Sequence, residues 1–276
     1  MNILRLHLIS LFFTGFFCSL FGQVGGEEEE HGFSLFGTVQ SGDASFSTVG
    51  AEFQITASDG AQIDYYNFDI PAGETVRFIQ PTSAASVVNK ILGQMPTQID
   101  GNLYGNGKVV LLNSFGIVFG KNSVVEVGKL HAIAGTDIQE SFSLSGAITN
   151  AGSIKAKEVV LAGKSVTNTG TILVEEGSLV MAAGASVELT DGDNTLSVSL
   201  SSEDPNPHSG ASDIAGQAVL QSGVVQASKA QFYGNSITHG GSTQANSVQV
   251  GNYSSFSSTN EDLGTSGSLV ANELSI

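Results

Sequence analysis

The sequence predicts an all-β chain, a right-handed parallel β-helix (a solenoid) with N-terminal capping strands. Composition is the first reason, because only 13% of the 276 residues are charged and 34 are glycine. Ordinary globular domains carry about 25% charged residues and about 7% glycine, so residues for helix surfaces are scarce and turn residues are abundant. The other two reasons are short apolar clusters and their repetition at a fixed spacing.

The apolar clusters are three to five residues long, rich in Val, Ile, Leu and Phe, and separated by Gly, Asn, Asp and Ser. This pattern is typical of short strands joined by turns. It predicts strands at residues 109–112, 117–119, 124–127, 159–161, 172–174, 179–181 and 187–189. A helical interpretation suggests itself only at residues 84–92, a segment too short to change the fold class.

The clusters recur along the chain. Residues 148–154 (ITNAGSI) return as 166–172 (VTNTGTI), and residues 159–162 (VVLA) return as 179–182 (LVMA). A weaker copy covers 219–227, and residues 268–271 resemble the second unit.

A period near 20 residues indicates one coil of a solenoid, in which each strand lies about 4.8 Å above its predecessor. We expect inward columns of apolar side chains, Gly and Asn at the corners, and about twelve coils. The alternative is an antiparallel sandwich, which needs hairpin turns between strands and does not favour copies at a fixed offset.

The N-terminus has the order of a secretory signal peptide. Arg5 and His7 precede the uncharged apolar stretch 8–17, and small residues follow near Gly22. Residues 1–22 are therefore expected to be a signal peptide, and the acidic segment 23–32 a flexible leader. An uncleaved anchor is the alternative, although its apolar stretch is shorter than the ~20 residues that span a bilayer.

Charge and cysteine content narrow the function further. The net charge of −16 argues against nucleic acid or anionic lipid as partner, because both require a basic face. Cys18 lies within the expected signal peptide, so the mature chain has no disulfide. Stability must then come from a large hydrogen-bonded core.

Four segments carry a family resemblance: 37–42 (GTVQSG), 67–81 (NFDIPAGETVRFIQP), 98–101 (QIDG) and 107–130. In this order, over about 100 residues, they resemble the N-terminal two-partner secretion (TPS) domain of filamentous haemagglutinin-type exoproteins. The repeats that follow resemble the β-helical shaft of such proteins. Besides the signal peptide (1–22) and the leader (23–32), we therefore expect a secretion domain (33–145) and a β-helical shaft (146–276).

The resemblance also implies a route and a partner. Such exoproteins cross the periplasm and are exported through an outer-membrane barrel transporter with periplasmic recognition domains. They end secreted or at the cell surface, where the implied role is that of an adhesin or cell-contact protein. A surface glycan or receptor is the implied target.

Two blocks, 67–76 and 113–119, are the expected recognition region. Its candidate residues are Asn67, Ile70, Gly73, Glu74, Asn113, Gly116, Ile117 and Phe119. The family's Asn-Pro-Asn-Gly-Ile turn is here Asn-Ser-Phe-Gly-Ile, without the proline that would preset φ. In the simpler interpretation the asparagine and glycine of this turn only form a coil corner. The transporter contact could be strand addition to an unpaired edge.

Catalysis is the competing function, because parallel β-helices also build polysaccharide lyases. The carboxylate candidates are Glu175 with Glu176, Asp191 with Asp193, and Glu203 with Asp204. Adjacent strand residues face opposite ways, so the two glutamates at 175–176 and the pair at 203–204 do not converge. Asp191 with Asp193 could bind Ca²⁺ weakly, but is expected to be a polar turn at a coil corner. The histidines His131, His208 and His239 show no metal-ligand spacing, and His131 is expected to be a packed side chain. We expect no enzyme activity, cofactor or metal; a carbohydrate-binding or carbohydrate-active β-helix is the alternative.

The repeats continue to residue 276, inside what the pattern indicates is another coil. An exposed final coil presents unpaired backbone and a stacked apolar column. We therefore expect end-to-end self-association or docking of a separate partner there.

Overall fold

The computed structural model describes residues 33, 35–138, 141–175, 177–192, 195–201, 217–251, 255–258 and 268–275. The expected signal peptide and leader, Glu176, Asp193, Glu203, Asp204, His208 and residue 276 lie outside these ranges. Residues Phe33–Ile276 form one compact unit. The regular secondary structure of the described ranges consists of β-strands alone. No helix there is long and apolar enough to span a membrane.

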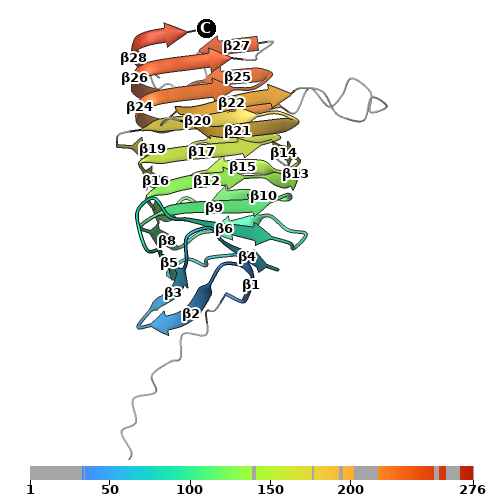
Figure 1. Cartoon of the computed structure of the whole chain (residues 1–276). Coiled ribbons are helices and arrows are strands. Elements are labelled where there is room, and N and C mark those ends of the chain that lie inside the picture. The colour runs from blue at the N-terminus through green and yellow to red at the C-terminus, as the bar shows by residue number, and fades with distance from the viewer. Residues whose placement is uncertain are drawn as a thin grey trace, which may run out of the picture. The chain divides into compact units, whose positions relative to one another are not determined.

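The chain winds in coils whose strands stack into three parallel ladders, here called faces 1, 2 and 3 (Figure 1). Face 1 contains β7 (Thr97–Ile99), β10 (Gly116–Phe119), β15 (Ala147–Asn150), β18 (Ser165–Asn168), β23 (Ala218–Gln221), β25 (Ser236–His239) and β27 (Ser255–Ser258). Face 2 contains β3 (Glu52–Ala57), β5 (Thr75–Ile79), β8 (Asn102–Gly105), β11 (Val124–Glu126), β16 (Ser153–Ala156) and β19 (Thr171–Val174). Face 3 contains β4 (Ala61–Tyr65), β6 (Ser86–Ile91), β9 (Lys108–Asn113), β12 (Lys129–Ile133), β17 (Glu158–Gly163) and β20 (Ser178–Ala183).

Three longer strands continue both face 2 and face 3. They are β24 (Val224–Tyr233), β26 (Ser242–Gly251) and β28 (Ser268–Ser275). The predicted parallel β-helix is thus confirmed.

The repeats predicted from the sequence lie in register. Ile148 pairs with Val166 on face 1, and Val159 pairs with Leu179 on face 3. One assignment was wrong: residues 268–271 resemble the face 3 unit 179–182 but pair with Ser242–Ala245 on face 2. Residues 84–92 form a strand, β6, because alternate side chains of this segment point into the core.

Antiparallel pairing occurs in two places among the described strands. At the N-terminal end, β1 (Gly37–Ser41) pairs with β4, and β2 (Ala44–Val49) pairs with β3, which confirms the predicted capping strands. The second place is a four-stranded sheet outside the coils, here called the outer sheet, made of β13 (Gly135–Ile138), β14 (Ser141–Leu144), β21 (Ser186–Gly192) and β22 (Thr195–Ser201).

The outer sheet explains why the expected coil number was wrong. Face 2 contains nine strands among the described residues once the three longer strands are included, fewer than the twelve coils expected. Chain that enters the outer sheet leaves the winding and adds no coil.

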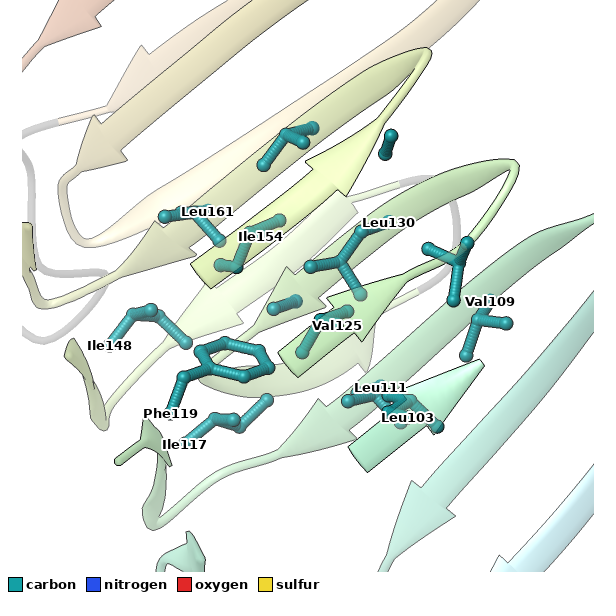
Figure 2. Packing of buried hydrophobic residues seen from close by; sticks show 14 of the residues in the cluster. Leu103, Val109, Leu111, Ile117, Phe119, Val125, Leu130, Ile148, Ile154 and Leu161 are labelled. Atoms are coloured by element: carbon teal, nitrogen blue, oxygen red, sulfur yellow. The ribbon is translucent and has the colours of Figure 1, made fainter. Parts of the chain in front are cut away.

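Alternate side chains of all three faces point inward and form the inner core. Figure 2 shows how Leu103, Val125 and Ile154 of face 2 meet Val109, Leu111, Leu130 and Leu161 of face 3 and Ile117, Phe119 and Ile148 of face 1. These side chains are fully buried. Their columns are the direct consequence of stacking equivalent residues of successive coils.

The middle strands of face 3 are buried on their other side as well. The outward side chains of β9, β12, β17 and β20 form a second cluster with β14 and β21, here called the outer core: Val110, Leu112, Ile133, Leu144, Val160, Ala162, Val180, Ala182 and Val187. Strands buried on both faces have continuous apolar runs rather than alternation. This accounts for the runs VVLL, VVLA and LVMA.

The inner core also contains a ladder of amides. Asn150 donates through Nδ2 to Oδ1 of Asn168 at 2.8 Å, and Asn168 donates through Nδ2 to Oε1 of Gln221 at 2.7 Å. All three side chains are buried. The asparagines were expected at corners, and their side chains instead point inward and hydrogen-bond from coil to coil.

Glycines with positive φ gather near the N-terminal end. Among the described residues they are Gly42, Gly50, Gly60, Gly73 and Gly116. The later described coils turn their corners without a left-handed glycine.

Candidate functional site

The first predicted block, 67–76, forms the corner that begins face 1. The backbone N–H of Ile70 donates to the carbonyl of Gln98 at 2.8 Å, and the carbonyl of Ile70 accepts from the N–H of Asp100 at 2.8 Å. Oδ1 of Asp69 accepts from the N–H of Gln98 at 2.7 Å. The block is therefore fastened to β7 by both backbone and side chain.

A tight turn completes this block. The N–H of Glu74 donates to the carbonyl of Pro71 at 3.1 Å, and the carbonyl of Glu74 accepts from the N–H of Asn102 at 2.9 Å. Gly73 has φ of 89°, a conformation that glycine adopts without the steric cost of a Cβ. Asn67 and Gly73 are exposed, and Glu74 is half-buried.

The second block, 113–119, is organised by Asn113, which is buried. Its Nδ2 donates to the carbonyl of Met95 and to Oγ1 of Thr97, each at 3.0 Å, and its Oδ1 accepts from the N–H of Phe115 at 2.8 Å. The carbonyl of Ser114 accepts from Oγ of Ser145 at 2.7 Å. These side-chain hydrogen bonds fix the turn that lacks the family's proline.

Gly116 is required by close stacking. Its φ is 118°, and a Cβ there would lie 2.7 Å from the carbonyl oxygen of Ala147 in the next coil. Any larger residue would have to push the two coils apart.

The structure brings the two blocks together on face 1. Ile70 bridges to Ile99, and Phe119 pairs with Ile99 from the other side. Ile70, Ile117 and Phe119 are fully buried in the inner core, so their side chains shape this corner from within.

Sequence reasoning missed the exposed apolar side chains beside these blocks. Tyr66 is 80% exposed, Leu92 54%, Met95 75% and Phe115 48%. We call these four residues the apolar ridge. They follow β4, β6 and β9 in successive coils, where Tyr65, Ile91 and Asn113 are in register, so they gather at the corner between faces 3 and 1.

Hydrogen bonds hold the backbone segments that carry the ridge next to one another. The N–H of Leu92 donates to the carbonyl of Tyr65 at 2.8 Å, and Asn113 joins the carbonyl of Met95 to the N–H of Phe115. The only sequence signal was the occurrence of large apolar residues in turns, as in LGQMP. Contiguous exposed apolar side chains mark interaction sites.

An aromatic cluster supports the ridge from inside. The ring of Tyr65 packs edge-on against Phe68 with centroids 4.9 Å apart, and Phe68 stacks on Phe78 at 6.2 Å. Burial raises the pKa of the Tyr65 phenol, so it is neutral at physiological pH. The ridge therefore has an uncharged, closely packed support.

The remaining candidates lie elsewhere. His131 is buried, and its Nε2 lies 2.7 Å from Oε1 of Glu158, whose Oε2 is 3.3 Å from Nζ of Lys129. The hydrogen bond from His131 lowers the pKa of Glu158, against the effect of burial. His131 is thus a packed side chain, as predicted.

Two other titratable candidates, His239 and Glu175, are also engaged in packing or pairing. Nε2 of His239 lies 2.9 Å from Oγ1 of Thr243, and burial lowers the pKa of His239. Glu175 pairs with Lys155 at 3.2 Å. In the described part of the chain no group of three His, Cys, Asp or Glu residues could hold a metal ion.

Comparison with known proteins adds independent findings. A family model described as "TPS secretion domain" matches residues 37–271. A heme/hemopexin-binding protein of Haemophilus influenzae (strain ATCC 51907 / DSM 11121 / KW20 / Rd) is 30% identical over 184 residues, which are 59% of this chain and 20% of that protein. A second heme/hemopexin-binding protein of Haemophilus influenzae is 34% identical over 103 residues, 37% of this chain and 11% of the relative. The match thus spans a fifth or less of the length of these relatives.

The structure resembles the crystal structure of the HMW1 secretion domain from Haemophilus influenzae. The TM-score is 0.58 at 18% sequence identity, and the match covers 87% of this chain and 83% of that one. At this identity the likeness shows the fold.

Proposed function

The chain belongs to the TPS secretion domain family, and from this premise we propose that its outer-membrane transporter recognises it through the apolar ridge. Members of the family are two-partner secretion substrates, exported across the outer membrane to the cell surface or the extracellular space. The partner of that export is the outer-membrane transporter. The proposal concerns which surface of the chain it contacts.

The ridge is the observation that carries the proposal. It places two aromatic residues and a methionine beside each other on the surface, residue types that are enriched in protein interfaces. Tyr66, Met95 and Phe115 are each about half exposed or more, so a partner can bury them. Burial of apolar surface contributes about 25 cal/mol per Å².

The predicted motif residues then act as positioning residues. Asn113 holds Met95 and Phe115 in place, Gly116 permits the close stacking of the coils, and Ile70 and Phe119 anchor the corner in the core. This proposal assigns recognition to the segment 33–145 and the shaft to 146–276.

The test is secretion together with direct binding. We expect the triple variant Tyr66→Ser, Met95→Ser, Phe115→Ser to bind the isolated periplasmic domains of the transporter at least about 100-fold more weakly, since interface anchors contribute 1 to 2 kcal/mol or more each. Secretion with the transporter should fall in parallel, while circular dichroism shows an unchanged fold.

The matched controls are Val49→Ser and Leu220→Ser, exposed apolar residues away from the ridge, which should bind normally. Equal loss in the controls, or normal binding by the triple variant, would refute the proposal. Normal binding would instead favour strand addition at β1 or β2, which pair on one side only among the described strands.

We propose further that this chain serves as an adhesin-type exoprotein and that its described residues do not bind haem. The relatives are named heme/hemopexin-binding proteins, yet the two histidines of the described ranges, His131 and His239, are 6% and 3% exposed and cannot reach a haem on the surface. Titration of the chain with hemin should give no change in haem absorbance. A change in absorbance that is abolished by His131→Ala or His239→Ala would contradict this proposal.

A further inference from the structure

We propose that the outer surface of face 2 binds an uncharged glycan chain that lies along the coil axis. The proposal is independent of transporter recognition, because the apolar ridge lies on the corner between faces 3 and 1. It rests on one column of outward side chains, here called the face 2 column: Arg77, Tyr104, Glu126, Lys155, Leu173, Gln226 and Gln244.

The strand register aligns this column. Arg77 pairs with Tyr104, Tyr104 with Glu126, Glu126 with Lys155, Lys155 with Leu173, Leu173 with Gln226, and Gln226 with Gln244. Strands of one sheet are spaced about 4.8 Å apart. A polymer lying on the column therefore meets one side chain per coil, which suits a ligand with repeating groups.

The column borders two separate hollows at the bend between faces 2 and 3, here together called the trough. The first section of the trough has a volume of about 490 Å³ and includes Arg77, Tyr104 and Glu126. The second section has a volume of about 470 Å³ and includes Gln226 and Gln244. Both volumes fall within the range of about 300–1,000 Å³ that is usual for ligand sites.

Each cation beside the trough is paired with a carboxylate. Nε of Arg77 lies 2.8 Å from Oε1 of Glu52, and its guanidinium lies 4.7 Å from the centre of the Tyr104 ring. Nζ of Lys155 lies 3.4 Å from Oε1 of Glu126 and 3.2 Å from Oε1 of Glu175.

Three carboxylates thus face two cations, which leaves one negative charge in excess. The trough therefore offers hydrogen-bond donors and acceptors to an uncharged ligand. It has no basic surface that would attract an anionic glycan.

Exposed amides provide the remaining polar groups. Nε2 of Gln226 lies 3.5 Å from Oε1 of Gln244, one coil away. An amide donates and accepts at once, which matches hydroxyl groups that do the same. Because the column's side chains are already held by their neighbours, a ligand would order few of them on binding.

A peptide fits this surface less well. Every strand from β5 to β26 on face 2 is paired on both sides, so strand addition has no free edge. Ala227 and Ala245 line the second section of the trough, which provides no deep pocket for a large apolar anchor. The polar groups and shallow shape favour a chain rich in hydroxyls.

The test is titration of the full chain, followed by NMR or calorimetry. The probes are hexasaccharides of glucose, galactose, mannose and N-acetylglucosamine, with heparin and the peptide (Ser-Gly)₆ as the charged and peptidic comparisons. We expect at least one uncharged hexasaccharide to bind, and heparin and the peptide not to bind.

Variants locate the site. The double variant Gln226→Ala, Gln244→Ala should weaken binding about tenfold, the loss expected from one to two hydrogen bonds, and Tyr104→Ala should also weaken it. Gln62→Ala, an exposed amide on face 3, should bind as the parent does. All variants should be secreted normally, which separates this proposal from transporter recognition.

Three results would overturn the proposal: no binding of any uncharged hexasaccharide, binding of heparin or the peptide in its place, or binding that both the double variant and Tyr104→Ala leave unchanged.

Discussion

The inner core and the outer core use opposite sides of the same strands and are built in different ways. In β17, Leu161 points into the coils and Val160 points out beneath the outer sheet. The inner core receives equivalent residues from every coil, so repetition alone produces it. The outer core needs two segments that do not repeat, β14 and β21, to arrive from different coils.

This difference has a consequence for cooperativity. In a solenoid each coil contacts only its neighbours, and stability is close to a sum of local terms. The outer sheet pairs Phe142 with Val187 and so ties together coils that are not adjacent in the chain. The outer core should make coils of the middle of the molecule unfold as one unit.

The largest expected effect tests the inner core. Leu161→Ala should lower the free energy of unfolding by about 2–5 kcal/mol, because a fully buried leucine leaves a cavity. Denaturant unfolding measures it. Val160→Ala, on the outer side of the same strand and equally buried, should cost about 1–3 kcal/mol, because it removes two carbons instead of three. A cost for Val160→Ala as large as that for Leu161→Ala would show that the outer core relaxes less around a cavity than the inner core does.

The amide ladder offers the second test. Asn168→Ala removes the acceptor of Asn150 and the donor to Gln221, leaving two buried polar groups without partners. We expect a loss of about 2–4 kcal/mol in the free energy of unfolding. Thr167→Ala, which removes an outward side chain from the same strand, should cost much less. A loss as small as that of the control would mean that water replaces the missing amide.

The outer sheet is the third test. Val187→Ala should cost about 1–3 kcal/mol and should loosen β14 and β21 more than the ladders of the coils. Hydrogen exchange distinguishes the outer sheet from the coils. Amides of the outer sheet should exchange faster, while those of β17 and β18 stay protected. Uniform loss of protection would mean that the inner and outer cores unfold together.

The smallest effect concerns pH. The pKa of Glu158 is held below its ordinary value of 4.5 mainly by the hydrogen bond from His131. The folded state therefore favours the ionised carboxylate, and this contribution is fully present above pH 4.5. It is lost as pH falls through the lowered pKa.

Because the carboxylate is half-buried, we expect a contribution of about 1 kcal/mol or less. Glu158→Gln should flatten the fall in stability between pH 5 and pH 3 in thermal unfolding. An unchanged slope would place the acid sensitivity in other groups.

Much of the coil architecture was predictable because it repeats. The pairs Ile148 with Val166 and Val159 with Leu179 followed from the offsets alone. The outer sheet was not predictable, since its β14–β21 pairing joins unlike sequences with no fixed spacing. The run at 109–112 predicted a strand but was not interpreted as a strand buried on both sides.

The candidate site was predictable only in part. Motif residues such as Asn113 and Gly116 mark a turn because their chemistry is specific to turns. Which neighbouring side chains face the solvent depends on the stacking of three coils, so Tyr66 and Met95 became visible only in the structure. The amide ladder was missed for a similar reason. Asparagine is common in turns and is also suited to hydrogen bonding between coils, and the sequence alone does not distinguish these two roles.

The confinement of left-handed glycines to the first coils, the last of them at Gly116, bears on how such proteins change over evolution. The later corners need no left-handed backbone but still need glycine, because a Cβ at Gly152, Gly170 or Gly223 would clash with a backbone oxygen of the preceding coil. Tandem duplication of an 18-residue unit, such as the step from Ile148 to Val166, would carry its own corner glycine and so insert one more layer. The shaft can therefore lengthen by genetic copying, whereas the opening coils also depend on left-handed glycines at fixed positions.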